Sequence, residues 1–112
     1  MYTVKLTAEV TTFIRNLDLK MRAKVYKTIE LLKEFGPFLT EPHSKFITGI
    51  KKLRELRIKQ GSNIVRLFYF HYKNKTYIIT SGYLKKENKI NKKELAKAEK
   101  ILNEIIIGEK NA

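Results

Sequence analysis

Residues 64–72, IVRLFYFHY, constrain the fold more than any other stretch of this chain. Both sets of alternating positions in this stretch are apolar, whereas a half-exposed strand alternates between apolar and polar residues. A strand that is apolar on both sides is expected in the centre of a sheet. The two sets are Ile64, Phe68 and Phe70, and Val65, Leu67 and Tyr69. We therefore expect a sheet with residues 64–72 at or near its centre.

The residues before position 37 predict a short strand and two helices. Residues 2–6 alternate as a strand does, and apolar residues at helical spacing follow from there. Thr7 and Asp18 are suited to capping the two helices. Gly36-Pro37 ends the second helix, because glycine suits the position after a helix and proline cannot continue it. We expect a helical hairpin over residues 8–35 whose apolar faces cover the sheet.

The remaining residues predict a loop, two more strands and a last helix. Residues 38–50 are expected to be loop, and residues 53–59 and 76–84 to be strands on either side of the central one. The last helix begins at Asn91, which has capping-box spacing to Glu94. The order β-α-α-β-β-β-α predicts one α+β domain over residues 1–112. Its sheet is small, mixed and mostly antiparallel, covered by the N-terminal helical hairpin and the C-terminal helix.

The strong positive charge indicates the kind of partner. There are 24 Lys and Arg residues against 11 Asp and Glu, a net charge of +13. The excess is uneven, because residues 1–48 hold 8 basic and 5 acidic side chains and residues 49–112 hold 16 and 6. Such a surface favours a polyanion, whose phosphates release counterions on binding. The alternative is an ordinary charged surface that only keeps the protein soluble, and the asymmetry argues against it.

Several classes of protein are excluded or disfavoured by what the sequence lacks. There is no cysteine, so disulfides and thiolate metal sites are excluded. His43 and His71 do not have the spacing of a zinc site, and we expect no metal or other cofactor. We find no signal peptide and no apolar run long enough to span a membrane. We expect a cytoplasmic protein with no membrane partner.

Cations and aromatic side chains are interleaved between residues 51 and 93. Cations hold phosphates, and aromatic rings stack on unpaired bases. The aromatic residues are Phe68, Tyr69, Phe70, Tyr72, Tyr77 and Tyr83, and those at 68–72 are expected to be mostly core. The cations expected to bind RNA are Lys51, Lys52, Arg54, Lys59 and Lys89.

Two arginines in this region could act on a phosphate. If Leu56 and Ile58 point to the core, Arg57 points to the opposite face of the sheet. Arg66 stands among large apolar residues, where a charge is costly unless it is paired or opens onto a cleft. Both interpretations of Arg66 remain open: a salt bridge, for example to Glu55, or a functional cation.

Other polar residues also have a structural and a functional interpretation. Lys85 and Lys86 are either a functional pair or an ordinary solvated strand end. Tyr83 is more often a core residue than a proton donor. His43 is expected to be polar loop surface, and His71 a residue at a strand edge.

Three motifs in order give a resemblance to a known family. They are KLRELR at 52–57, VRLFY at 65–69 and GYLKK at 82–86, and a helix with Glu94 and Ala98 follows them. The set resembles the HigB branch of the RelE/ParE-like toxins of bacterial type II toxin–antitoxin systems. The predicted helical hairpin fits the same family, so the resemblance covers nearly the whole chain.

The resemblance implies a RelE-like fold and a metal-independent endoribonuclease, an mRNA interferase that commonly cuts messenger RNA in the translating ribosome. It also implies a small helix-turn-helix antitoxin of the HigA type, bound to the toxin in a hetero-oligomer. The positions that match the family's motifs, and are therefore the predicted catalytic residues, are Arg57, Arg66, Tyr83, Lys85 and Lys86.

The sequence departs from the family at two positions. Ser81 stands where many relatives have histidine, and Tyr83 replaces phenylalanine. The first change removes a candidate acid or base and the second supplies one. The proton carrier therefore stays open between Tyr83 and a lysine whose pKa is lowered by crowded cations.

Three other functions remain as alternatives. ParE-like toxins of the same superfamily inhibit DNA gyrase and do not cut RNA. A non-enzymatic nucleic-acid-binding module would need the basic face and aromatic rings but no catalytic geometry. A protein-interaction domain would need neither the basic face nor a catalytic geometry.

Overall fold

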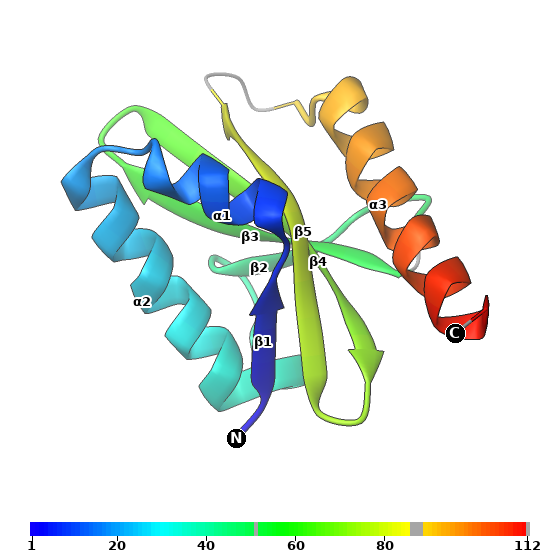
Figure 1. The fold of residues 1–112 in the computed structure, drawn as a ribbon. Coiled ribbons are helices and arrows are strands. Elements are labelled where there is room, and N and C mark those ends of the chain that lie inside the picture. Colours follow the sequence, from blue (N-terminus) through cyan, green and yellow to red (C-terminus); the bar gives the residue numbers. More distant parts are fainter. Residues whose placement is uncertain (51, 86–88, 112) are drawn as a thin grey trace.

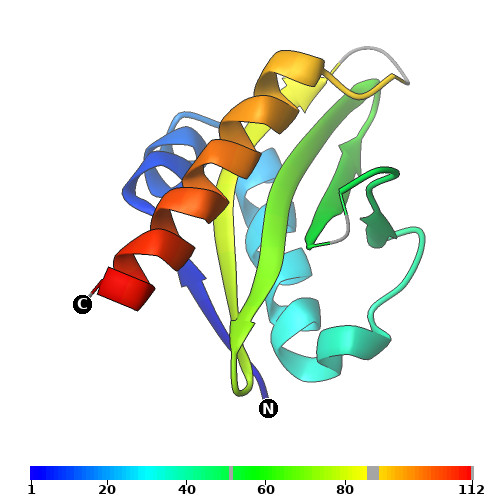
Figure 2. The same ribbon diagram turned by 90° about the vertical axis from the view of Figure 1, so that its right-hand side faces the viewer.

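The computed structural model describes residues 1–50, 52–85 and 89–111, and it has three layers (Figure 1). A central sheet carries two helices on one face and a third, C-terminal helix on the other (Figures 1 and 2). The elements along the chain are β1 (Thr3–Leu6), α1 (Ala8–Arg15), α2 (Leu19–Phe35), the 3-10 helix η1 (Gly36–Phe38), β2 (Ser44–Phe46), β3 (Leu53–Gln60), β4 (Asn63–Lys73), β5 (Thr76–Lys85) and α3 (Lys92–Asn111). This is the predicted α+β fold.

The sheet has five strands in the order β1-β5-β4-β3-β2. The first pair, β1 with β5, is parallel and the other three are antiparallel. The central position of β4 agrees with the prediction for residues 64–72, and Val65 to Phe70 are all buried. Each face of the sheet therefore has its own core, one under α1 and α2 and one under α3.

The predicted capping residues are confirmed at the starts of the helices. Thr7 Oγ1 accepts from the Val10 N–H at 3.2 Å, and Asp18 Oδ1 accepts from the Met21 N–H at 2.8 Å. These side chains satisfy backbone donors that have no partner within the helix. Gly36 ends α2 with a φ of 52°, and a Cβ there would lie 2.3 Å from the ring of Tyr2.

The start of α3 differs from the predicted capping box in one half. Asn91 Oδ1 accepts from the backbone N–H groups of Lys93 and Glu94, as a cap should. The Asn91 N–H donates to the hydroxyl of Tyr83 at 3.1 Å, where a capping box would use the Glu94 side chain. The cap thus attaches the start of α3 to β5.

The prediction of a loop over residues 38–50 is wrong in part. Residues 36–38 form η1, and Ser44–Phe46 form the edge strand β2 beside β3. A strand of three residues is too short to show alternation in the sequence. Its pairing places Lys45 opposite Glu55 and Phe46 opposite Arg54.

The ladder between β4 and β5 is irregular at two places, and the one near its middle is an extra residue on β5. Phe68 pairs with Ser81 and Tyr69 pairs with Ile79, so Thr80 has no opposite residue. Such a bulge changes which side chains face each side of the sheet. After it, Ser81, Tyr83 and Lys85 face the α3 side together with Ile78.

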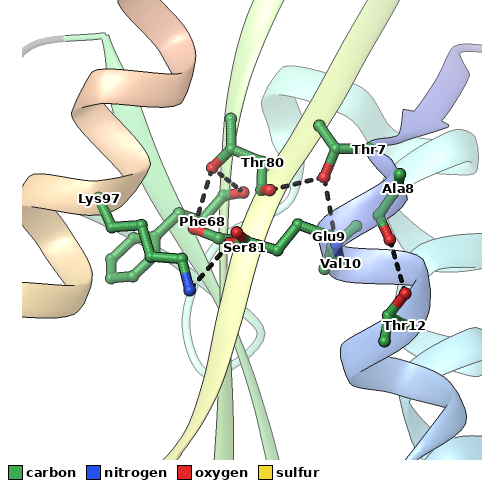
Figure 3. Close-up of polar contacts among 9 residues, drawn as sticks. All are labelled: Thr7, Ala8, Glu9, Val10, Thr12, Phe68, Thr80, Ser81 and Lys97. Atoms are coloured by element: carbon green, nitrogen blue, oxygen red, sulfur yellow. Dashed lines mark hydrogen bonds and ion pairs between the residues drawn. The ribbon is translucent and has the colours of Figure 1, made fainter.

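The start of α1 is bonded to β5 at this bulge and to α3 nearby (Figure 3). The Thr7 hydroxyl donates to the Thr80 carbonyl at 2.6 Å. The pairing of β1 with β5 ends at Leu6 and Ile79. Beyond that point Glu9 of α1 and Lys97 of α3 form an ion pair of 3.1 Å across the edge of β5.

Among the residues that the structure describes, no helix is both long and apolar enough to span a membrane.

Candidate nucleic-acid interface

Three of the predicted catalytic residues form one row across adjacent strands. Arg57 of β3 is opposite Arg66 of β4, and Arg66 is opposite Tyr83 of β5. Directly paired residues in a sheet point to the same face, so all three side chains lie on the α3 side. The sequence-based expectation that Arg57 points away from Leu56 and Ile58 is confirmed, because those two residues belong to the core under α1 and α2.

Arg66 is held by a buried carboxylate. Its Nη1 donates to Glu55 Oε1 at 2.8 Å and to Oε2 at 3.0 Å. Glu55 is 2% exposed and Arg66 is 5% exposed. The salt bridge considered as one interpretation of Arg66 is therefore present. It does not remove the functional interpretation, because both residues line a cavity of about 200 Å³ together with Lys45, Phe46 and other residues.

Arg57 is the accessible cation of the row. Its side chain is 30% exposed, and its Nε lies 3.9 Å from Glu55 Oε1. It lines a second cavity, of about 290 Å³, with His43 and Lys59. A guanidinium at the mouth of a cavity can offer two parallel donors to a phosphate. The row thus has one fixed, buried guanidinium and one that solvent reaches.

Tyr83 is mainly a core residue. Its ring stacks on Phe68, with centroids 5.8 Å apart and planes at 24°. Burial raises the pKa of the Tyr83 hydroxyl above its ordinary value of 10.0. The hydroxyl therefore stays protonated at neutral pH and is a weaker acid than a free tyrosine, so it can give up its proton only to a strongly basic oxygen.

Lys85 is buried at 4% exposure, so its interpretation as an ordinary solvated strand end is wrong. A cavity of about 550 Å³ is lined by Tyr83 and Lys85 of β5 and by Lys89 and Ile90, which precede α3. Lys86, its predicted partner, lies outside the described residues. Lys85 and Lys59 both pair with Ile64, on opposite sides of it, so they extend the cationic face by a second row.

The predicted RNA-binding cations divide between the two faces of the sheet. Lys59 and Lys89 border the cavities beside Arg57 and Tyr83. Lys52 and Arg54 line a separate cleft of about 620 Å³ that also contains Tyr2 and Tyr77. Lys51 lies outside the described residues. The predicted set is therefore not one patch.

His43 is the residue whose position the sequence did not reveal. It was expected to be polar loop surface, and it is exposed, but it also lines the cavity of Arg57. The Arg57 N–H donates to the His43 carbonyl at 2.9 Å, which fixes the loop against β3. An imidazole that shares a cavity with Arg57 and Lys59 is a candidate proton acceptor. Among the described residues, no group of three or more His, Asp or Glu side chains could hold a metal ion.

Comparisons with known proteins agree with this architecture. Residues 12–103 match the family model described as Phage derived protein Gp49-like (DUF891). No curated protein sequence matches the chain.

Solved structures of RelE proteins are similar in fold. A mutant Escherichia coli toxin RelE in the free state has a TM-score of 0.57 at 18% identity, over 72% of this chain and 80% of that one. The intact E. coli RelBE toxin-antitoxin complex has a TM-score of 0.57 at 20% identity, over 80% of this chain and 100% of that one. The archaeal RelE-RelB complex from Pyrococcus horikoshii OT3 has a TM-score of 0.55 at 19% identity, over 79% of this chain and 98% of that one. At these identities the likeness is one of fold.

Proposed function

Because this chain belongs to the Gp49-like family of phage-derived proteins, we propose that it is the toxin of a toxin–antitoxin pair and an endoribonuclease that cuts messenger RNA. The RelE-like fold supports the proposal. The observation that carries it is the row of Arg57, Arg66 and Tyr83 on one cationic face of the sheet. We assign the chain to the HigB-like branch on the three motifs of β3, β4 and β5.

We propose that the side chains at this site supply the groups that cleavage of RNA needs. The 2′-hydroxyl of the substrate attacks the neighbouring phosphorus, the 2′-O–P bond forms and the bond to the 5′-oxygen breaks. The products are a 2′,3′-cyclic phosphate and a 5′-hydroxyl. One proton leaves the 2′-hydroxyl and one reaches the leaving oxygen. Charge that grows on the phosphate must be stabilised by positioned donors.

Each side chain of the row has a task in that reaction. Arg57, which solvent reaches, binds a phosphate oxygen, and Arg66 places a fixed guanidinium charge behind it. Tyr83, whose hydroxyl stays protonated, supplies a proton to the leaving 5′-oxygen, which becomes strongly basic as its bond to phosphorus breaks. His43 is the candidate acceptor of the proton from the 2′-hydroxyl, and the exposed Lys59 holds a flanking phosphate. The buried Lys85 adds positive charge to the same face of the sheet.

Partners follow from the same proposal. The RelE structures include complexes with antitoxins, and we propose that this chain is neutralised by a small helix-turn-helix antitoxin of the HigA type in a hetero-oligomer. We propose the translating ribosome as the place of cleavage, because a ribosome-held message would already be oriented for in-line attack. Lys59 and Lys89, which border the cavities beside Arg57 and Tyr83, extend the cationic face for the RNA strand.

A non-enzymatic nucleic-acid-binding module is the second candidate. It is favoured by one observation: both oxygens of Glu55 accept from Arg66, and a guanidinium so engaged has fewer donors for a phosphate. Such a module would hold RNA without cutting it.

Cleavage of messenger RNA in a translation extract distinguishes the two candidates. The chain should cut the message, and Arg57→Ala should lower the rate roughly a hundred- to a thousandfold, as loss of a donor to transition-state charge does. Lys27→Ala, which removes an exposed cation from α2, is the matched control and should keep the rate. Equal cleavage by Arg57→Ala and the unchanged chain would show that the site is elsewhere. Retention of intact RNA would support the binding module.

A further inference from the structure

An exposed aromatic ring stands at the edge of the sheet beside the proposed site. Phe46 ends β2 and is 66% exposed, which is unusual for a phenylalanine in a strand. The guanidinium of Arg54, its partner on β3, lies over the ring at 4.0 Å from the centroid. The two planar groups thus form one pre-assembled pair, with the ring open to solvent.

Phe46 contributes to the walls of two cavities. One contains Glu55 and Arg66 of the proposed site, and the other is the cleft of about 620 Å³ that contains Lys52 and Arg54. Neighbouring residues of a strand point to opposite faces, and Lys45 pairs with Glu55 while Phe46 pairs with Arg54. The strand β2 is the sheet edge, so a ligand can pass around it from one face to the other.

The larger cleft combines cations with aromatic rings. Lys52 is exposed at its rim, and Tyr2 and Tyr77 pack edge to face with centroids 5.9 Å apart. Burial raises the pKa of Tyr77, so its ring system stays neutral beside the cations. A volume of several hundred Å³ is ordinary for a ligand site. Cations that follow a backbone, with rings for the bases, are the general means of holding a single strand.

We propose that Phe46 and Arg54 form a stacking subsite for an unpaired RNA base next to the cut, and that the strand continues into the Lys52–Arg54 cleft. This inference rests on the proposed function for the position of the cut, and it adds the path of the substrate around β2. The occupant is single-stranded RNA and not a protein segment, because cations and stacked planar groups line the path from Arg66 to Lys52.

The absence of tryptophan from the chain makes a direct test available. Phe46→Trp introduces a single indole at the subsite, and Tyr26→Trp introduces one at an exposed position of α2 as the matched control. The probe is a single-stranded RNA oligomer with 2′-O-methyl groups, which binds but has no nucleophile. Indole fluorescence of the Phe46→Trp variant should be quenched on titration, and that of the control should change little.

Affinity for the same oligomer gives the second measurement. Phe46→Ala should weaken binding roughly 5- to 150-fold, the range for loss of one base–aromatic stack. Phe46→Tyr should restore it, because the ring is kept, and Tyr26→Ala should leave it unchanged. Arg54→Lys keeps the charge but loses the planar group, so its affinity for the oligomer should lie between those of Phe46→Ala and Phe46→Tyr.

The outcomes separate this subsite from the proposed function. Quenching without any cleavage by the unchanged chain would support the subsite and contradict the nuclease. Cleavage by the unchanged chain, with no quenching and no loss of affinity in Phe46→Ala, would overturn the subsite and leave the nuclease. An indole that responds to a bound antitoxin but not to RNA would also overturn it, because the surface would then serve a protein.

Discussion

Removal of the Glu55 carboxylate should destabilise the fold more than any other single change at the site. Glu55 and Arg66 are both almost fully buried, and two hydrogen bonds of 2.8 and 3.0 Å join them. Breaking such a pair by removing one partner costs about 3–5 kcal/mol, since the other charge stays in a medium of low dielectric. The adjoining cavity of about 200 Å³ can admit water to the guanidinium. We therefore expect a value near the lower end, about 3 kcal/mol, for Glu55→Ala.

Urea unfolding followed by circular dichroism measures this cost, and a double-mutant cycle assigns it to the pair. Arg66→Met and Glu55→Leu should each destabilise the chain. The double variant should recover much of the loss, because a buried ion pair replaced by apolar residues of similar size is often neutral or better. It should also be inactive, because the Arg66 guanidinium is gone. A cost below about 1 kcal/mol for Glu55→Ala, or a coupling energy near zero, would refute the role given to this pair.

Three further changes follow from the packing. Gly82→Ala should destabilise the chain by about 1–3 kcal/mol in urea unfolding, because a Cβ there would lie 2.4 Å from Leu67 Cδ2 and 3.1 Å from the Arg66 carbonyl oxygen; Gly108→Ala in α3, where a Cβ meets nothing within 4 Å, should instead stabilise it by up to about 1 kcal/mol. Lys85→Glu should lower the melting temperature, contrary to what a solvated strand end would allow, and an unchanged melt would contradict its burial. Burial raises the pKa of Tyr83, so the folded state holds that proton more tightly, and the free energy of unfolding should fall as pH rises above about 10. Tyr83→Phe should reduce this slope, and an equal slope in both proteins would refute it.

The local elements could be predicted because their signals are local. Thr7, Asp18 and Gly36 mark helix ends through hydrogen bonds and backbone conformation within a few residues. The double-sided apolar character of residues 64–72 identified the central strand, since it reflects burial from both faces.

The arrangement of the candidate site could be predicted only in part. Strand parity placed Arg57 correctly, and Glu55 was recognised as a partner for Arg66. The position of His43 beside Arg57 depends on how a loop returns to β3, which no local pattern encodes. The burial of Lys85 depends on residues 89–92, which line the same cavity as Lys85 although they lie beyond the end of β5. Phe46 was overlooked, because β2 is too short to be recognised and its stacking on Arg54 is a contact between strands.

Thr80, which has no opposite residue on β4, determines which face of the sheet each later side chain of β5 points to. If Thr80 paired with Phe68 and the ladder ran on without the bulge, Gly82 and Leu84 would turn towards α3 and Tyr83 and Lys85 towards α1. The arginines of the row would then face a strand with no phenol and no ammonium group. In comparisons among relatives, the pairing of the GYLKK motif with β4 is thus as informative as the motif itself.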